Sequence, residues 1–161
     1  MLFNSLTFII FLPIVFIIFH LFPKKYRWLV LLLSSYTFYT FWKFSYLILI
    51  LSSTIIDYFA AIQINKTENK KIKKILLGIS LLVNLGLLFF FKYLLFTLSL
   101  LDTIFPFAHV STSVSNLNIL LPVGISFYTF QTIGYTIDVY RKKIQPEKHF
   151  GKFALYVSFF P

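Results

Sequence analysis

The residues best suited to acid–base chemistry are three histidines, and their surroundings do not favour catalysis. His20, His109 and His149 lack a carboxylate at the spacing of the His-x4-Asp arrangement found in soluble glycerolipid acyltransferases. Each lies at the end of an apolar run or in a polar segment, where a solvated histidine is the ordinary outcome. We therefore expect none of the three to be catalytic.

A possible nucleophile motif begins at Gly124 but is not completed. Gly124-Ile125-Ser126-Phe127-Tyr128 places a tyrosine where a nucleophile elbow needs its second glycine for close packing, and no strand precedes it. The sequence also contains no phosphate-cradling glycine loop, zinc-binding helix motif or EF-hand loop. It has no cysteine, which excludes thiol catalysis and cysteine-ligated metal within these residues. We expect no metal site.

Asp57 is the one acidic residue well inside an apolar run. An intramembrane carboxylate is a candidate proton or ion site, but it can also be a partner for a lysine or for a polar helix terminus. The second interpretation is favoured, because the sequence offers no second buried ionisable group for a relay. Asp138 differs: it can pair with Arg141 or Lys142 near the membrane interface as an anchor.

Polar side chains are concentrated over residues 124–140. At about 100° per residue in a helix, Tyr128, Thr132, Tyr135 and Thr136 share one face, and Gln131 lies at its edge. A polar stripe on a membrane helix faces either a cavity or another helix. Periodicity alone does not choose between them.

These residues must be positioned by membrane helices, because the composition excludes an ordinary soluble domain. Apolar residues make up 58% of the 161 residues, aromatic residues 21% and charged residues only 12%, whereas a globular chain carries about a quarter charged residues. The same composition excludes a disordered chain, a collagen-like chain and a disulfide-stapled secreted module. A bilayer span needs about 20 apolar residues, so the chain has room for several.

We predict an all-α integral membrane protein, a polytopic helical bundle with five full transmembrane helices and the start of a sixth. The predicted spans cover residues 6–22, 28–42, 46–64, 73–91 and 119–139, with an interfacial helix over about 93–101 and a partial apolar element at 150–161. Residues 102–118 read as an exposed loop. Pro13 is tolerable within a bilayer span, and Lys92 is expected to snorkel outward. In the fourth span, small and polar positions are expected at the helix contacts: Gly78, Ser80, Asn84 and Gly86.

The formal net charge of +10 comes mainly from three short clusters between the apolar runs. The clusters are Lys24, Lys25 and Arg27; Lys66, Lys70, Lys71, Lys73 and Lys74; and Arg141, Lys142, Lys143 and Lys148. This pattern is typical of topology-setting charge rather than of a nucleic-acid surface. It predicts a multi-pass protein of the cytoplasmic membrane, with its N-terminus outside and all three clusters on the cytoplasmic side. The bilayer is the expected partner, with anionic headgroups near the middle cluster, and no nucleic acid.

Two segments in the C-terminal half together resemble a family signature. Pro122–Gln131, followed by Tyr135–Arg141, is similar to the signature of membrane-bound O-acyltransferases of the bacterial alginate O-acetyltransferase type. Three further stretches agree with this pattern: Met1–Ser5, Phe90–Tyr93 and Val157–Pro161. The similarity covers essentially the whole chain, and the D-alanyl transfer branch is a weaker match to the same segments.

The resemblance implies that residues 1–161 form the N-terminal part of a single multi-pass acyltransferase domain around a central tunnel. It implies transfer of an acyl group, expected to be acetyl, from a cytoplasmic acyl-CoA or acyl-carrier thioester to hydroxyls of an exported polysaccharide. It also implies an extracytoplasmic acyltransferase- or esterase-like partner protein and no bound cofactor. The family's essential histidine lies beyond Pro161, so the chain alone is expected to be inactive. Tyr128, Gln131 and Thr132 are candidates for the tunnel wall.

Two other functions stay open. A transporter or channel subunit would show paired intramembrane charges or broken helices repeated in two halves, whereas the sequence offers one Asp57 and one Pro122-x-Gly124 break. A non-catalytic, truncated membrane protein is the interpretation if the gene ends at Pro161.

Overall fold

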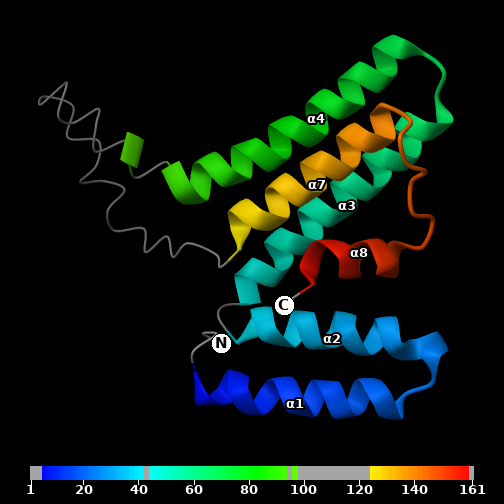
Figure 1. The fold of residues 1–161 in the computed structure, drawn as a ribbon. Coiled ribbons are helices and arrows are strands. Elements are labelled where there is room, and N and C mark those ends of the chain that lie inside the picture. The colour runs from blue at the N-terminus through cyan, green and yellow to red at the C-terminus, as the bar shows by residue number, and fades with distance from the viewer. Residues whose placement is uncertain (1–4, 42–43, 94–95, 98–123, 160–161) are drawn as a thin grey trace, which may run out of the picture.

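The computed structural model describes residues 5–41, 44–93, 96–97 and 124–159. Within these ranges the chain is helical and contains no strand. The helices are α1 (Leu6–Leu21), α2 (Arg27–Thr40), α3 (Phe44–Lys66), α4 (Lys70–Leu88), α7 (Ile125–Tyr140) and α8 (Phe150–Ser158). A 3₁₀ turn (Lys24–Tyr26) precedes α2, and a π-helical turn (Phe89–Tyr93) continues α4. Figure 1 shows their arrangement.

Local capping fixes where two of these helices begin. The hydroxyl of Ser5 accepts a hydrogen bond from the backbone N–H of Phe8 at 3.2 Å and caps α1. The side-chain oxygen of Asn69 accepts from the N–H of Lys71 at 2.9 Å and caps α4. Both residues are of the types that satisfy free N–H groups at a helix start. Pro13 lies inside α1 without ending it, as the sequence predicts.

Three helices pack together to hold the candidate site. Helices α3, α4 and α7 contact one another, and α8 lies against α2, α3 and α7 (Figure 1). Helix α1 packs on α2 at the edge of the bundle. The largest buried cluster joins α3, α4, α7 and α8: Ile50, Leu88, Ile125, Tyr128, Phe153 and Val157. The core therefore surrounds the first half of α7.

The outer surface of the bundle is apolar. Helix α1 buries only Val15, and large apolar side chains are exposed elsewhere, such as Leu82 at 75% and Phe127 at 74%. Contiguous exposed apolar surface marks contact with a membrane or with other protein. Two helical stretches, Phe44–Lys66 and Lys70–Tyr93, are long and apolar enough to cross a bilayer, whereas the apolar α1 is shorter. The count of five spans and the outside N-terminus stay predictions.

The basic clusters share one end of the bundle. Figure 1 shows the α1–α2, α3–α4 and α7–α8 connections together at the same end of the helices, and these connections contain or adjoin the three clusters of Lys and Arg. This placement agrees with the prediction that the three clusters lie on one side of the membrane. Which side that is stays a prediction.

Several predicted segments lie partly outside the described residues. These are the interfacial helix at 93–101, of which Phe96 and Thr97 are helical, the loop at 102–118 with His109, and the start of the span at 119–139. The partial apolar element at 150–161 forms α8, which ends at Ser158.

One prediction about the fourth span is half wrong. Ser80 and Asn84 are buried at helix contacts, whereas Gly78 and Gly86 are exposed and nothing lies within 4 Å of where their Cβ atoms would be. The two glycines therefore do not mediate close helix packing within the described residues.

Gly151 is required for the packing of α8 on α2. A Cβ atom at this position would overlap the indole ring of Trp28. The same indole ring packs edge-on against the imidazole of His149, with 4.8 Å between the ring centroids. We expect Gly151→Ala to lower the free energy of unfolding by about 1–3 kcal/mol, because the ring must shift within a packed contact. Thermal unfolding in detergent measures this. In a Trp28→Leu background the same change should be neutral or stabilising, since alanine favours helix, and an equal loss in both backgrounds would contradict the clash.

Candidate functional site

A polar cluster lies buried between α3, α4 and α7. It consists of Asp57, Ser80, Asn84 and Thr132, each at most 1% exposed. The Ser80 hydroxyl donates to Asp57 Oδ1 at 2.6 Å, and Asn84 Nδ2 donates to Oδ1 at 2.9 Å and Oδ2 at 2.8 Å. Asn84 Oδ1 in turn lies 3.2 Å from the hydroxyl of Thr132, which can donate to it. The cluster thus links three helices through one carboxyl group.

The partners of Asp57 differ from the prediction. Among the described residues, neither a lysine nor a helix terminus contacts its carboxyl group; neutral donors from the middle of α4 do. Both oxygens accept hydrogen bonds, which suits a carboxylate because an ionised carboxyl group is an acceptor only. Burying such a group in a bilayer requires that its hydrogen bonds be satisfied. Asp57 therefore depends on Ser80 and Asn84 for its buried place between the helices.

The polar face of α7 packs against other helices. Thr129, Thr132 and Thr136 are each at most 1% exposed, and Tyr128 is 2% exposed. This confirms the stripe predicted from periodicity, with Tyr135 half-buried at its margin. Of the two alternatives left open, contact with another helix is the one seen at Thr132, through Asn84.

The three tunnel-wall candidates have different environments. Thr132 belongs to the polar cluster, and the side-chain amide of Gln131 donates to the backbone oxygen of Tyr156 on α8 at 2.9 Å. The hydroxyl of Tyr128 is buried and has no hydrogen-bond partner among the described residues. A buried hydroxyl without a partner is costly, so it marks a position where a ligand or further protein would be stabilised. A role in lining a tunnel stays a prediction for all three.

The start of α7 is shaped by the backbone conformation of Gly124 and by a hydrogen bond from Lys92, which the sequence only partly indicated. Gly124 adopts a left-handed backbone conformation (φ 78°), which glycine tolerates best, directly before the helix. The ammonium of Lys92 donates to the hydroxyl of Ser126 at 3.3 Å and lies over the ring of Tyr93. Lys92 is exposed, as predicted, and it also joins the end of α4 to the start of α7.

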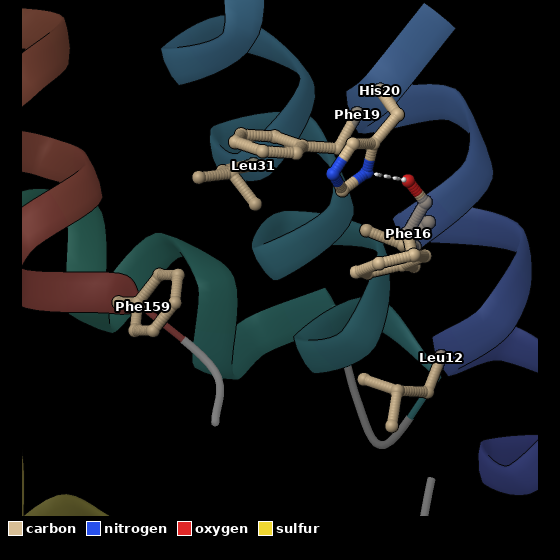
Figure 2. Close-up of a pocket in the computed structure, with 7 residues that line it drawn as sticks. Leu12, Phe16, Phe19, His20, Leu31 and Phe159 are labelled. Atoms are coloured by element: carbon tan, nitrogen blue, oxygen red, sulfur yellow. Dashed lines mark hydrogen bonds between the residues drawn. The ribbon is translucent and has the colours of Figure 1, made fainter.

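The two described histidines make aromatic and backbone contacts. Figure 2 shows His20 in an apolar groove of about 390 Å³, with its Nδ1 atom 2.9 Å from the backbone oxygen of Phe16. The groove is lined by residues of α1 and α2 and by Phe159: Leu12, Val15, Phe16, Phe19, His20, Leu31 and Phe159. His149 packs against Trp28 and precedes α8. Neither contact orients an imidazole toward a carboxylate.

The predicted pairing of Asp138 is wrong in its partner. Its carboxylate lies 3.9 Å from the ammonium of Lys143, and both side chains are exposed. Helix α7 ends at Tyr140, so the helical spacing that would bring Arg141 or Lys142 to Asp138 does not continue.

Among the described residues, no group of three or more His, Cys, Asp or Glu side chains is placed to hold a metal ion.

The comparisons with known proteins find relatives that are named as O-acetylases or O-acetyltransferases. The chain is 36% identical over its whole length to a probable alginate O-acetylase of Azotobacter vinelandii, of which it covers 32%. It is also 36% identical to a probable alginate O-acetylase of Pseudomonas aeruginosa, covering 31% of that protein and all of this chain. A peptidoglycan O-acetyltransferase of Helicobacter pylori is 36% identical over 88% of this chain and 30% of its own length. The chain thus spans about a third of the length of these relatives.

Two other comparisons found nothing. No protein-family model matches the chain. No solved structure matches it either.

Proposed function

Since the chain belongs to the family of membrane-bound O-acyltransferases, we propose that it forms part of an enzyme that O-acetylates a polysaccharide. The observation that carries this proposal is the match to O-acetylases of alginate and peptidoglycan along the chain, at 33–36% identity. The helical fold, with two stretches long and apolar enough to cross a bilayer, supports a membrane location.

The proposal extends to the orientation and the substrates. The enzyme is a multi-pass protein of the cytoplasmic membrane, with its basic connections inside and its N-terminus outside. It takes the acetyl group from an acyl-CoA or acyl-carrier thioester in the cytoplasm and transfers it to hydroxyls of an exported polysaccharide, with an extracytoplasmic acyltransferase- or esterase-like protein as partner. The shared end of the three basic clusters supports this orientation.

Within this enzyme, the described helices contribute a wall rather than the acid–base group. Acyl transfer needs a base at the acceptor hydroxyl and a dry path for the acyl group. The polar cluster of Asp57, Ser80, Asn84 and Thr132 holds α3, α4 and α7 together. Among the described residues, the hydroxyl of Tyr128 is the buried side-chain group without a hydrogen-bond partner, so it has a hydrogen bond to give. The proton transfer itself is assigned to the part of the enzyme beyond the chain.

Deletion and complementation of the whole gene test the proposed function. We expect the O-acetyl content of the exported polysaccharide, measured by NMR after purification, to fall on deletion and to return when the full-length gene is supplied. An unchanged O-acetyl content in the deletion strain, with polysaccharide still exported, would show that the enzyme acts on something else.

A further inference from the structure

A basic cavity opens at the end of the bundle where α3 meets α4 and where α7 ends. Its volume is about 640 Å³, within the range of small-molecule sites. It is lined mainly by polar and charged residues of the two connections and of the adjoining ends of α3 and α4: Asn65, Lys66, Thr67, Glu68, Lys73, Lys142, Lys143, Ile144 and Gln145. Two segments more than 60 residues apart in sequence thus bring their lysines to one hollow.

Positive charge dominates among the residues that line this cavity. Four lysines face a single glutamate, Glu68. Among the described residues, the only ion pair that any of these lysines makes is between Lys143 and Asp138, at 3.9 Å with both side chains exposed, a kind of pair that contributes little. Four like charges around one hollow repel one another, so binding an anion there would be favourable.

Lys142 occupies its position in the cavity at a conformational cost. Helix α7 ends in a Schellman motif, in which the N–H of Lys142 bonds to the oxygen of Val139 at 3.0 Å and the N–H of Lys143 to that of Asp138 at 2.9 Å. Lys142 is the left-handed residue of this motif, with φ 58°, where glycine is usual. It is the only described residue other than glycine with a positive φ. A lysine in this place gives up stability and adds a positive charge to the cavity.

We propose that this basic cavity is a binding site for a phosphate-bearing anion. Lysine binds phosphate as a point charge, and the cavity adds neutral hydrogen-bond donors in Asn65, Thr67 and Gln145. The anion is either the phosphate of a soluble ester or the headgroup of an anionic lipid, because the cavity lies at the end of two helices that can cross a bilayer. This site does not depend on the acyl transfer proposed above.

The test compares two variants of equal charge. Lys66→Gln/Lys143→Gln removes two lysines from the cavity, and Lys70→Gln/Lys74→Gln removes two from the first turns of α4 that do not line it. Each chain is placed in nanodiscs of phosphatidylcholine and titrated with inorganic pyrophosphate by calorimetry. In parallel, nanodiscs with added phosphatidylglycerol are analysed by native mass spectrometry for retained phosphatidylglycerol.

Either of two results supports the site. If the ligand is soluble, pyrophosphate binding weakens by about tenfold in the cavity variant and by much less in the control. If it is a headgroup, retained phosphatidylglycerol falls in the cavity variant alone. Equal behaviour of the two variants in both measurements would overturn the proposal.

A third variant separates binding from folding. Lys142→Gly should raise the melting temperature by about 2–4 °C, because glycine relieves the left-handed conformation. It should at the same time weaken binding of whichever anion the wild type retains. A higher melting temperature with unchanged binding would show that Lys142 plays no part in the site.

Discussion

Replacing Asn84 by leucine should lower the free energy of unfolding by about 3 kcal/mol or more. Asn84 Nδ2 donates to both oxygens of Asp57, and the side-chain oxygen of Asn84 is available to Thr132. Leucine would remove two of the three side-chain hydrogen bonds that this buried carboxyl group accepts among the described residues and leave the one from Ser80. The free energy of unfolding of the wild type and the variant is measured in detergent, by steric trapping or by thermal unfolding.

The double variant Asp57→Leu/Asn84→Leu is the control for this effect. Removing both polar partners should recover part of the lost stability, because the buried carboxyl group is gone and the Ser80 hydroxyl alone loses its acceptor. Asp57→Asn should cost less than Asn84→Leu, since its amide oxygen still accepts from Ser80 and Asn84 at the Oδ1 position, although its NH2 group would face the Asn84 donor. If Asn84→Leu costs less than about 0.6 kcal/mol, the value typical of an ordinary interhelical hydrogen bond in a membrane, Asp57 does not depend on Asn84.

Tyr128→Phe in the full-length enzyme should lower acetyl transfer by about tenfold without lowering stability. The hydroxyl of Tyr128 is buried and unpartnered among the described residues, so removing it relieves an unsatisfied group and should leave stability equal or higher. If the hydroxyl serves the acyl path, losing one hydrogen bond worth about 1.4 kcal/mol slows transfer tenfold. Labelled acetyl transfer in membranes and thermal unfolding of the same protein give the two values.

Tyr135→Phe on the same helix is the matched control. The hydroxyl of Tyr135 accepts a hydrogen bond from the backbone N–H of Glu147 at 2.8 Å. Its removal should cost about 1 kcal/mol of stability and leave transfer per folded molecule unchanged. Equal activity of wild type and Tyr128→Phe would mean that the Tyr128 hydroxyl has no part in the reaction.

Helix periodicity was sufficient to predict the buried face of α7. The spacing of Tyr128, Thr132 and Thr136 places them on one side, and all three are buried. Periodicity within one helix says nothing about its neighbours, however. That Thr132 meets Asn84, and that Asn84 meets Asp57, depends on how α3, α4 and α7 are rotated and staggered.

In the predicted fourth span, the spacing of the small and polar residues indicates which of them lie at a helix contact, whereas their small size alone does not. Ser80 and Asn84 are four residues apart and therefore share a face, whereas Gly78 and Gly86 are each two residues away from one of them and fall on the opposite side. The buried serine and asparagine and the exposed glycines follow this division. Spacing, rather than residue size, would have identified the contact.

The end of α7 could not be read from residue types. Pairing Asp138 with Arg141 or Lys142 assumes that the helix continues, but α7 ends at Tyr140 and the chain turns at Lys142 with φ 58°. A glycine at position 142 would have predicted this helix end, but the sequence has lysine there. The turn brings Lys143 to within 3.9 Å of Asp138.

The most direct test of the proposed function is transfer by membranes that contain the full-length protein. Inside-out vesicles, whose outer face is the cytoplasmic one, are loaded with the exported polysaccharide in their lumen and are given a labelled acetyl thioester from outside. The polysaccharide is then purified and its label is counted. We expect label in alkali-labile O-acetyl groups, well above that from membranes of a strain lacking the gene. No label above that background, with the intact protein detected in the vesicles, would contradict it.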